Sequence, residues 1–405
     1  LSDTKSDTQG SGAARRWIES EFKRIAETCT ADFEVYTISD TVSGPRIPEP
    51  TEIVNVIAVQ KGILDPNRVI MMSGDIDSRV SDVANFTDDS PGANDNASGM
   101  AGTIEAARVL CKTKFPGTIV YAGLSGEEQG LYGGRILADH AKEKGWRVMG
   151  ILNNDMIGNI SGVNGVIDNT TARVFSEGTK ALETDQEARW RRFRGGEVDS
   201  PSRNLARLID RLADQYIPNL DVMMIYRLDR FGRGGHHRPF NEAGWPGVRI
   251  METNENYNRQ HQDIRTENGI KYGDTIDGVD FDYARKLTAL NVVTLADIAG
   301  SPPFPVDVQI VGAVQPSTTI KWNIRGNVRE HANLRGFRIY WRLTTDSQWR
   351  WSRFIGKDAR EMTLDNIVID NYFFGVSAVA NDGLDSPVVF PGPIGAFDMS
   401  NEDSE

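Results

Sequence analysis

The feature that most constrains this chain is a set of apolar runs that each end close to an acidic residue. The three runs are Val69–Met72, Thr118–Leu124 and Val148–Asn153. Segments with helical spacing of apolar residues follow the first two runs, from Met100 to Leu110 and over Leu131–Lys142. Short buried strands that alternate with helices predict an α/β fold, with a mainly parallel central sheet and helices on both faces.

A change of character near residue 300 predicts a second domain. Ser301–Pro305 reads S-P-P-F-P, which is typical of a linker. Regular short strands separated by turn signals follow it and predict a small all-β sandwich. We therefore predict a catalytic domain over 1–300, a linker over 301–305, the sandwich over 306–395 and an acidic tail over 396–405.

Composition excludes some classes of function. The 405 residues carry 45 Lys and Arg against 57 Asp and Glu, a net charge of −12, which disfavours a nucleic-acid partner. No apolar run approaches the roughly 18 residues of a membrane span. Because the chain starts at Leu1, we expect either that a signal segment was removed or that the start was trimmed. Cys29 and Cys111 fit one disulfide or two buried thiols.

The acids after the apolar runs suggest a metal site. Since an α/β sheet places its ligands at the carboxyl ends of its strands, we expect these side chains to converge. The candidates are Asp75, Asp77, Asp95, Glu127, Glu128, Asp155 and His237. Carboxylates and imidazoles bind divalent ions, and a free Glu beside a ligand would serve as general base. For any one of these residues alone, a solvated loop acid is the simpler interpretation.

Four blocks in this region resemble a known family. They are P-G-A-N-D-N-A-S-G at Pro91–Gly99, L-S-G-E-E-Q-G-L-Y-G-G at Leu124–Gly134, N-N-D-M-I-G at Asn153–Gly158, and H-R-P-F followed by A-G-W-P within His237–Pro246. In this order and spacing they resemble the co-catalytic zinc exopeptidases of metallopeptidase family 28. That family includes leucyl aminopeptidases and, as divergent members, glutaminyl cyclases. The resemblance covers most of Ala13–Ala299.

The resemblance implies a role for each matching position. Asp95 would be the carboxylate that bridges two zinc ions. Glu128 and His237 would complete one metal site with it, and Asp155 would belong to the other site. Glu127 would be the general base that takes a proton from the attacking water and passes it to the leaving amine.

Two positions depart from the family pattern. Asp75 stands where the family has a ligating histidine, and Asp77 stands where the acid that orients this ligand is expected. A second site made of Asp75, Asp95 and Asp155 would contain only oxygen ligands, which shifts its preference toward Mn²⁺, Mg²⁺ or Ca²⁺. His236 replaces a common Asp and is interpreted as a partner of a ligand, a substitute ligand or a plain loop histidine.

The loop before His237 supplies candidates for contacts with substrate. A hydroxyl at Tyr226 would stabilise a tetrahedral oxyanion. Arg230 or Arg233 would pair with a substrate carboxylate, and His236 is a further candidate. A surface loop with solvated arginines is the alternative interpretation. The polar, arginine-rich stretch over Glu183–Asp210 is likewise interpreted as a solvated helical face.

The last domain resembles a fibronectin type III module. Trp322 lies in an early strand, Gly336–Arg342 forms a central strand, and Tyr372 would be the corner tyrosine. The resemblance implies nothing about the partner of this domain. Because such modules accompany secreted enzymes, we expect a periplasmic or secreted protein.

Together these observations predict a metal-dependent exopeptidase that acts on peptides, most simply an aminopeptidase. It would use Zn²⁺, with one or two divalent ions bound. The alternatives are a glutaminyl-cyclase-like acyl transfer at a single zinc, and a non-catalytic binding protein on a degenerate peptidase scaffold. Replacing Glu127 separates an enzyme from a binder, because only an enzyme loses turnover.

Overall fold

The computed structural model describes residues 6–397, and its centre is an eight-stranded sheet. The strands are β1 (Phe33–Gly44), β2 (Ile47–Gln60), β3 (Asp65–Asp75), β4 (Gly117–Leu124), β5 (Arg147–Asn154), β6 (Thr171–Ser176), β7 (Asp221–Ile225) and β8 (Gly247–Glu252). Their order in the sheet is β1-β2-β4-β3-β5-β8-β6-β7. The pairs β3–β4, β3–β5, β5–β8 and β6–β7 are parallel, and the other three are antiparallel. The predicted α/β class is confirmed, with a mixed sheet.

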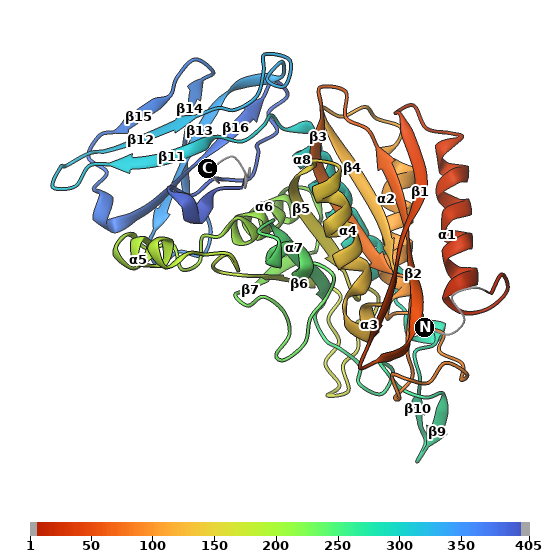
Figure 1. Cartoon of the computed structure of the whole chain (residues 1–405). Helices are drawn as coiled ribbons and strands as arrows, with labels where there is room; N and C mark the ends of the chain where they lie inside the picture. The colour runs from red at the N-terminus through yellow and green to blue at the C-terminus, as the bar shows by residue number, and fades with distance from the viewer. Residues whose placement is uncertain (1–5, 398–405) are drawn as a thin grey trace.

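Helices cover both faces of this sheet, as Figure 1 shows. One face packs against α1 (Gly10–Ala26), α2 (Ala97–Leu110), α6 (Pro201–Tyr216) and α8 (Phe281–Gly300). The other face packs against α4 (Tyr132–Glu143) and the short α7 (Arg238–Glu242). The central strands are buried on both sides, which explains their continuous apolar runs. No helix among the described residues is long and apolar enough to cross a membrane.

Two local features differ from the sequence-based prediction. The prolines at positions 45, 48 and 50 are typical of a turn, yet β2 begins at Ile47 and includes the last two. Because β4 pairs with β2 only from Val56 onward, this part of β2 lies at a sheet edge, where a missing N–H is tolerated. The short strand β6 was not predicted. It lies between β7 and β8 and pairs antiparallel with β8.

Cys29 and Cys111 form a disulfide with a Cα–Cα distance of 5.1 Å. It joins the segment after α1 to the residue that follows α2. Of the two states that the sequence allowed, the structure therefore has the disulfide.

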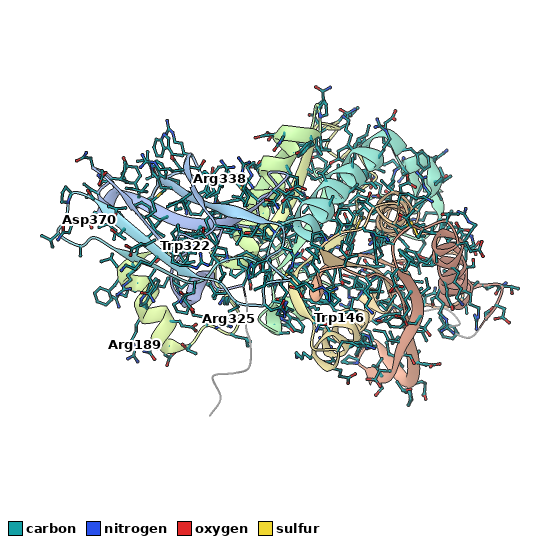
Figure 2. The ribbon with its side chains drawn as sticks, turned by 90° about the horizontal axis from the view of Figure 1, so that it is seen from above. Trp146, Arg189, Trp322, Arg325, Arg338 and Asp370 are labelled. Carbon is teal, nitrogen blue, oxygen red and sulfur yellow. A yellow bond between two sulfur atoms is a disulfide. The ribbon has the colours of Figure 1, made fainter. Side chains whose placement is uncertain are left out.

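The C-terminal part is all-β, as predicted. One antiparallel sheet contains β11 (Val306–Val311), β12 (Thr318–Asn323) and β15 (Glu361–Leu364), and the other contains β14 (Trp351–Gly356), β13 (Leu334–Leu343) and β16 (Tyr372–Ala380). Trp322, labelled in Figure 2, packs against Phe337 of the opposite sheet with ring centroids 5.2 Å apart. The resemblance to fibronectin type III stays a prediction.

A buried cluster of charges joins this domain to the sheet domain. Asp199, just before α6, pairs with Arg207 of α6 at 2.9 Å, and both its oxygens accept from Arg342 of β13 at 2.8 and 2.9 Å. All three side chains are almost fully buried. The prediction of a solvated arginine face is therefore wrong for Arg203 and Arg207, because α6 is covered on this side. It holds for Arg189 of α5 (Asp185–Arg194), which is exposed.

Asp199→Ala is expected to lower the free energy of unfolding by about 3–5 kcal/mol, because it leaves two buried guanidinium groups without a counter-charge. Urea unfolding followed by circular dichroism measures this loss. Arg189→Ala is the control and should change stability by less than about 0.5 kcal/mol. Equal stabilities of the Asp199 and Arg189 variants would contradict the structure of this interface.

The raised pKa of Asp297 in α8 leads us to expect that stability depends on pH. Burial raises its pKa, Arg211 lowers it and Asp385 raises it, with a result of about 7. Since the unfolded carboxyl has a pKa near 3.8, Asp297 binds a proton more strongly in the folded state between about pH 4 and 7, and its contribution to the free energy of unfolding falls as pH rises through this window. Asp297→Asn should remove this loss, so its stability relative to wild type should increase from pH 4.5 to 8. Parallel stability–pH curves would contradict this expectation.

Candidate metal site

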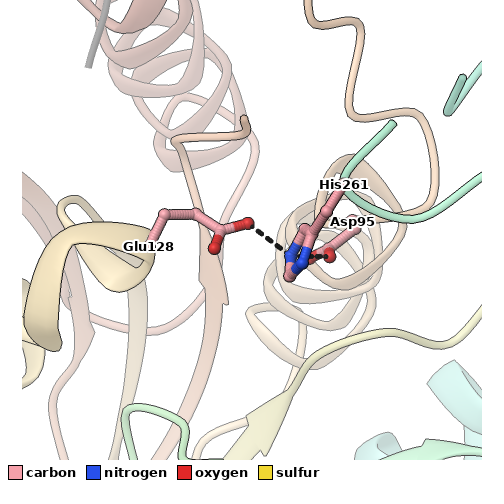
Figure 3. Close-up of side chains that lie close together, drawn as sticks. All are labelled: Asp95, Glu128 and His261. Atoms are coloured by element: carbon pink, nitrogen blue, oxygen red, sulfur yellow. Dashed lines mark ion pairs between the residues drawn. The ribbon is translucent and has the colours of Figure 1, made fainter. Parts of the chain in front are cut away.

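Three potential metal ligands from distant parts of the chain meet at one end of the central sheet. His261 Nε2 lies 3.0 Å from Asp95 Oδ2 and 2.9 Å from Glu128 Oε1. Figure 3 shows the three side chains turned toward one another. Asp95 lies in the loop before α2, and Glu128 belongs to α3 (Glu127–Gly130), which follows β4. His261 lies in the loop after β8. Among residues 6–397, no other His, Cys, Asp or Glu residues form such a group with ligand atoms within 4.8 Å of one another.

Asp77 fixes the turn that carries two of the acids. Its Oδ1 accepts from the backbone N–H of Gly126 at 2.7 Å and of Glu127 at 3.3 Å. Its Oδ2 accepts from the backbone N–H of Glu128 at 3.3 Å. A carboxylate at the start of a helix is favourable because the first N–H groups have no partner within the helix. Asp77 therefore orients Glu127 and Glu128, whereas we expected it to orient Asp75.

Side chains around the group hold Asp95 and His261 in place. Asp274 accepts from the backbone N–H of Asp95 at 2.7 Å, and Gln260 donates to Asp95 Oδ2 at 3.1 Å. Arg79 pairs with Glu128 Oε2 at 3.0 Å and lies 2.8 Å from His261 Nδ1. His261 has a φ of +57°, a left-handed conformation that is uncommon for a residue with a side chain and that often marks a functional site.

The charges of the group attract one another. Burial would lower the pKa of His261, but the hydrogen bonds and charges of Asp95 and Glu128 outweigh burial and raise it to about 9. Burial would raise the pKa of Asp95, but the hydrogen bond and charge of His261 hold it well below its usual range. The group therefore favours a cation beside its two carboxylates.

The three donors fit zinc. One imidazole and two carboxylates leave a position open in tetrahedral coordination, as catalytic zinc sites require. Ligands about 2.0–2.1 Å from a tetrahedral ion lie about 3.3 Å apart, close to the separations of His261 Nε2 from the two carboxylate oxygens. Asp95, Glu128 and His261 are thus the residues that would hold the ion.

Glu127 shares a pocket with this group. The pocket has a volume of about 380 Å³, and Asp95, Glu127, Glu128, Asp155 and His261 all line it. Burial raises the pKa of Glu127 well above its ordinary value, and the charges of Asp155 and Glu128 raise it further. A carboxyl with a raised pKa beside a metal site is suited to accept and return a proton.

His237 does not reach the group, contrary to our expectation. It is fully buried, and its Nε2 lies 2.9 Å from the carbonyl oxygen of Leu228 and 3.6 Å from Asp229. Burial lowers its pKa to about 4, so the ring is neutral. It is the residue that precedes α7, and its ring lies between the carbonyl oxygen of Leu228 and the side chain of Asn153 in β5. The imidazole beside Asp95 and Glu128 comes from His261 instead.

The acids expected at a second metal site contact other partners. Asp75 Oδ2 accepts from Asn96 at 2.7 Å, and its Oδ1 lies 3.4 Å from His236 Nε2. Asp155 Oδ2 lies 2.7 Å from Arg249 Nη2. Burial lowers the pKa of His236 to about 3, and the ring is fully buried. His236 is thus a partner of Asp75, and we correct its assignment to substrate binding.

The other predicted substrate contacts also find partners within the protein. The Tyr226 hydroxyl donates to the carbonyl oxygen of Ser347 at 3.3 Å, and the ring stacks on Arg203, away from the pocket. Arg230 and Arg233 do line the pocket, but each pairs with Glu255, at 2.9 and 3.0 Å. Of the two arginines, only Arg233 keeps substantial exposure, about a third of its side chain.

Comparisons with known proteins identify the family of this chain. The sequence model of peptidase family M28 matches residues 55–277. A probable zinc metalloprotease of Leptosphaeria maculans is 42% identical over 97% of this chain and 90% of its own length. A probable zinc metalloprotease of Pyricularia oryzae is 39% identical over 97% of this chain and 79% of its own length.

A solved structure shares the fold. LapA of Legionella pneumophila superposes with a TM-score of 0.52 at 22% identity, over 73% of this chain and 69% of its own. This likeness supports the α/β architecture, while the sequence matches identify the family. The chain belongs to peptidase family M28 and is related to zinc metalloproteases.

Proposed function

We propose that this protein is a zinc-dependent exopeptidase that acts on peptides, and specifically an aminopeptidase. The observation that carries the proposal is the convergence of Asp95, Glu128 and His261 in the pocket that also exposes Glu127. Membership of family M28 supports peptide hydrolysis. The preference for a chain terminus is our inference from the volume and the lining of the pocket.

Each residue has a defined task in this proposal. A bound zinc ion would polarise the attacking water and the substrate carbonyl. Glu127 takes the proton of the water and delivers it to the leaving amine. Asp77 holds the backbone of Glu127 and Glu128 so that both side chains keep their places. Asp274 and Gln260 do the same for Asp95.

The pocket supports action at a terminus. Its volume of about 380 Å³ is near the lower end of the range for small-ligand sites. Loop residues Gln129–Leu131 and Gly232–Gly234 contribute to its lining. Such a pocket accommodates a terminal residue better than the middle of an extended chain.

Matched peptides test the proposal. One peptide is offered with a free N-terminus, with an acetylated N-terminus and with an amidated C-terminus, and the products are identified by mass spectrometry. We expect stepwise release of N-terminal residues from the first and third forms only, and loss of activity with a zinc chelator. A peptide that starts with Gln distinguishes shortening from cyclisation. Internal cleavage, cyclisation without shortening, or hydrolysis that resists zinc removal would contradict the proposal.

We also propose that the protein works outside the cytoplasm. The disulfide between Cys29 and Cys111 supports this location, since such bonds persist in oxidising compartments. Detection of the chain in culture filtrate would support the proposal, and its confinement to the reducing cytosol would contradict it.

A further inference from the structure

Arg249 occupies a central position behind the metal site. It lies in β8, which is buried along its whole length, and its side chain is fully buried. Arg249 pairs in parallel register with Asn153 of β5, the strand that ends just before Asp155. A guanidinium at this point of the sheet faces the acids that follow the neighbouring strand.

The guanidinium group is held on several sides. Its Nε donates to the backbone oxygen of Asp155 at 2.6 Å, and its Nη2 lies 2.7 Å from the Asp155 carboxylate. Its Nη1 donates to the carbonyl oxygen of Gly234 at 2.7 Å and to Asp229 at 3.2 Å. Because these contacts use the planar fork of the side chain, Arg249 cannot leave Asp155 without losing several buried partners.

The Asp75 carboxylate also lies close to polar groups of the protein. Asn96 donates to its Oδ2. The backbone N–H of Gly134 donates to His236 Nδ1 at 3.0 Å, so the proton of the neutral ring is on Nε2. That Nε2 faces Asp75 Oδ1 at 3.4 Å. Asp75 therefore accepts a hydrogen bond at Oδ2, and its Oδ1 lies beside the His236 ring without forming a hydrogen bond.

A second divalent ion would compete with these donors. It would have to lie between Asp75, Asp95 and Asp155, where the positive charge of Arg249 repels it. The three acids do not form a group with converging ligand atoms in the part of the chain that is described. Two buried oxygens, Oδ1 of Asp75 and Oδ1 of Asp155, have no hydrogen-bond partner. These two oxygens are the atoms that could still bind a second ion, and the metal content of the protein shows whether they do.

We propose that this chain holds one divalent ion, at Asp95, Glu128 and His261, and that the guanidinium of Arg249 takes the place of a second ion by neutralising Asp155. The inference rests on the proposed function, because it assumes that the first site binds zinc. In this arrangement Asp95 binds one ion and does not bridge two. Arg249 acts as a positioning residue, since it is buried behind the pocket and holds Asp155 and the loop around Asp229 and Gly234.

Metal stoichiometry tests this inference. The full chain is stripped with a chelator, titrated with Co²⁺ and followed by its visible absorption, and the metal content is then measured after dialysis against excess Zn²⁺, Mn²⁺, Mg²⁺ or Ca²⁺. We expect one equivalent of Co²⁺ or Zn²⁺ and no second ion with any of the four metals. Two equivalents in the wild-type chain would overturn the inference.

Two substitutions sharpen the test. Asp75→Asn and Asp155→Asn should each keep one equivalent of Zn²⁺, with an affinity within about threefold of wild type. Loss of an ion in a folded Asp75→Asn chain would overturn the inference, whether or not the Asp155 variant folds. His261→Ala separates the two proposals. If the His261→Ala chain keeps the full metal content of the wild type, the proposed zinc site is wrong. If the wild type binds two ions and the His261→Ala chain loses one of them, the zinc site stands and only the one-ion inference is wrong.

Discussion

Glu127→Gln is expected to lower kcat/KM for peptide hydrolysis by roughly 10²–10⁴-fold while the protein keeps its zinc. The amide preserves the shape of the side chain, and the turn that Asp77 fixes depends on backbone N–H groups, which the substitution leaves unchanged. Only the capacity to accept a proton is lost. Steady-state kinetics and metal analysis on the same preparation measure both effects.

The matched control is Glu143→Gln, at the exposed end of α4. It makes the same chemical change away from the pocket and should leave kcat/KM unchanged. If Glu127→Gln retained full turnover, Glu127 would not be the proton carrier. If neither variant nor the wild type hydrolysed peptides, the binding-protein alternative would gain support.

His261→Ala is expected to weaken zinc binding by more than about 100-fold, because it removes one of three protein ligands, whereas changes in the residues around a ligand typically cost 10–100-fold. Competition with a chromogenic chelator measures the affinity. Loss of peptide hydrolysis should follow the loss of zinc and should not recover at zinc concentrations that saturate the wild type.

His237→Ala is the informative comparison, since the sequence motif pointed to His237. This variant should keep its zinc affinity even if thermal unfolding shows that it is less stable, because the ring is buried against Leu228 and Asp229. If His237→Ala folds but loses zinc while His261→Ala retains it, then His237 and not His261 is the zinc ligand.

Much of the fold could be predicted from the sequence because the central strands are buried on both faces. Continuous apolar runs such as Thr118–Leu124 predicted β4, and the acids close to the ends of the runs predicted that side chains would converge at one edge of the sheet. Glu128 follows such a run, whereas Asp95 stands just before a helix and was assigned from the family resemblance; the structure brings these two acids together. These inferences succeed because strand burial and strand ends leave local patterns in the sequence.

His261 was missed because it lies in an irregular loop where no periodicity marks its position. The signal that could have found it is R-Q-H-Q-D at Arg259–Asp263, a histidine among polar residues shortly after the apolar stretch that forms β8. The H-R-P-F motif drew attention to His237 instead. Both histidines follow strands of the sheet, and only the folded loops decide which one faces the acids.

The role of Arg249 could not be predicted from local patterns. A buried arginine in a strand is uncommon, and its partners Asp155 and Asp229 come from other parts of the chain. The same reason explains the wrong prediction for Arg207, whose partner Asp199 also binds Arg342 from the C-terminal domain. Charges that pair across domains or strands look like solvated charges in the sequence.

The most direct test of the central claim is an anomalous diffraction measurement at the zinc absorption edge on crystals of the zinc-loaded protein. We predict one strong peak, within bonding distance of Asp95, Glu128 and His261. A peak beside His237, or no peak among these three side chains, would contradict the account.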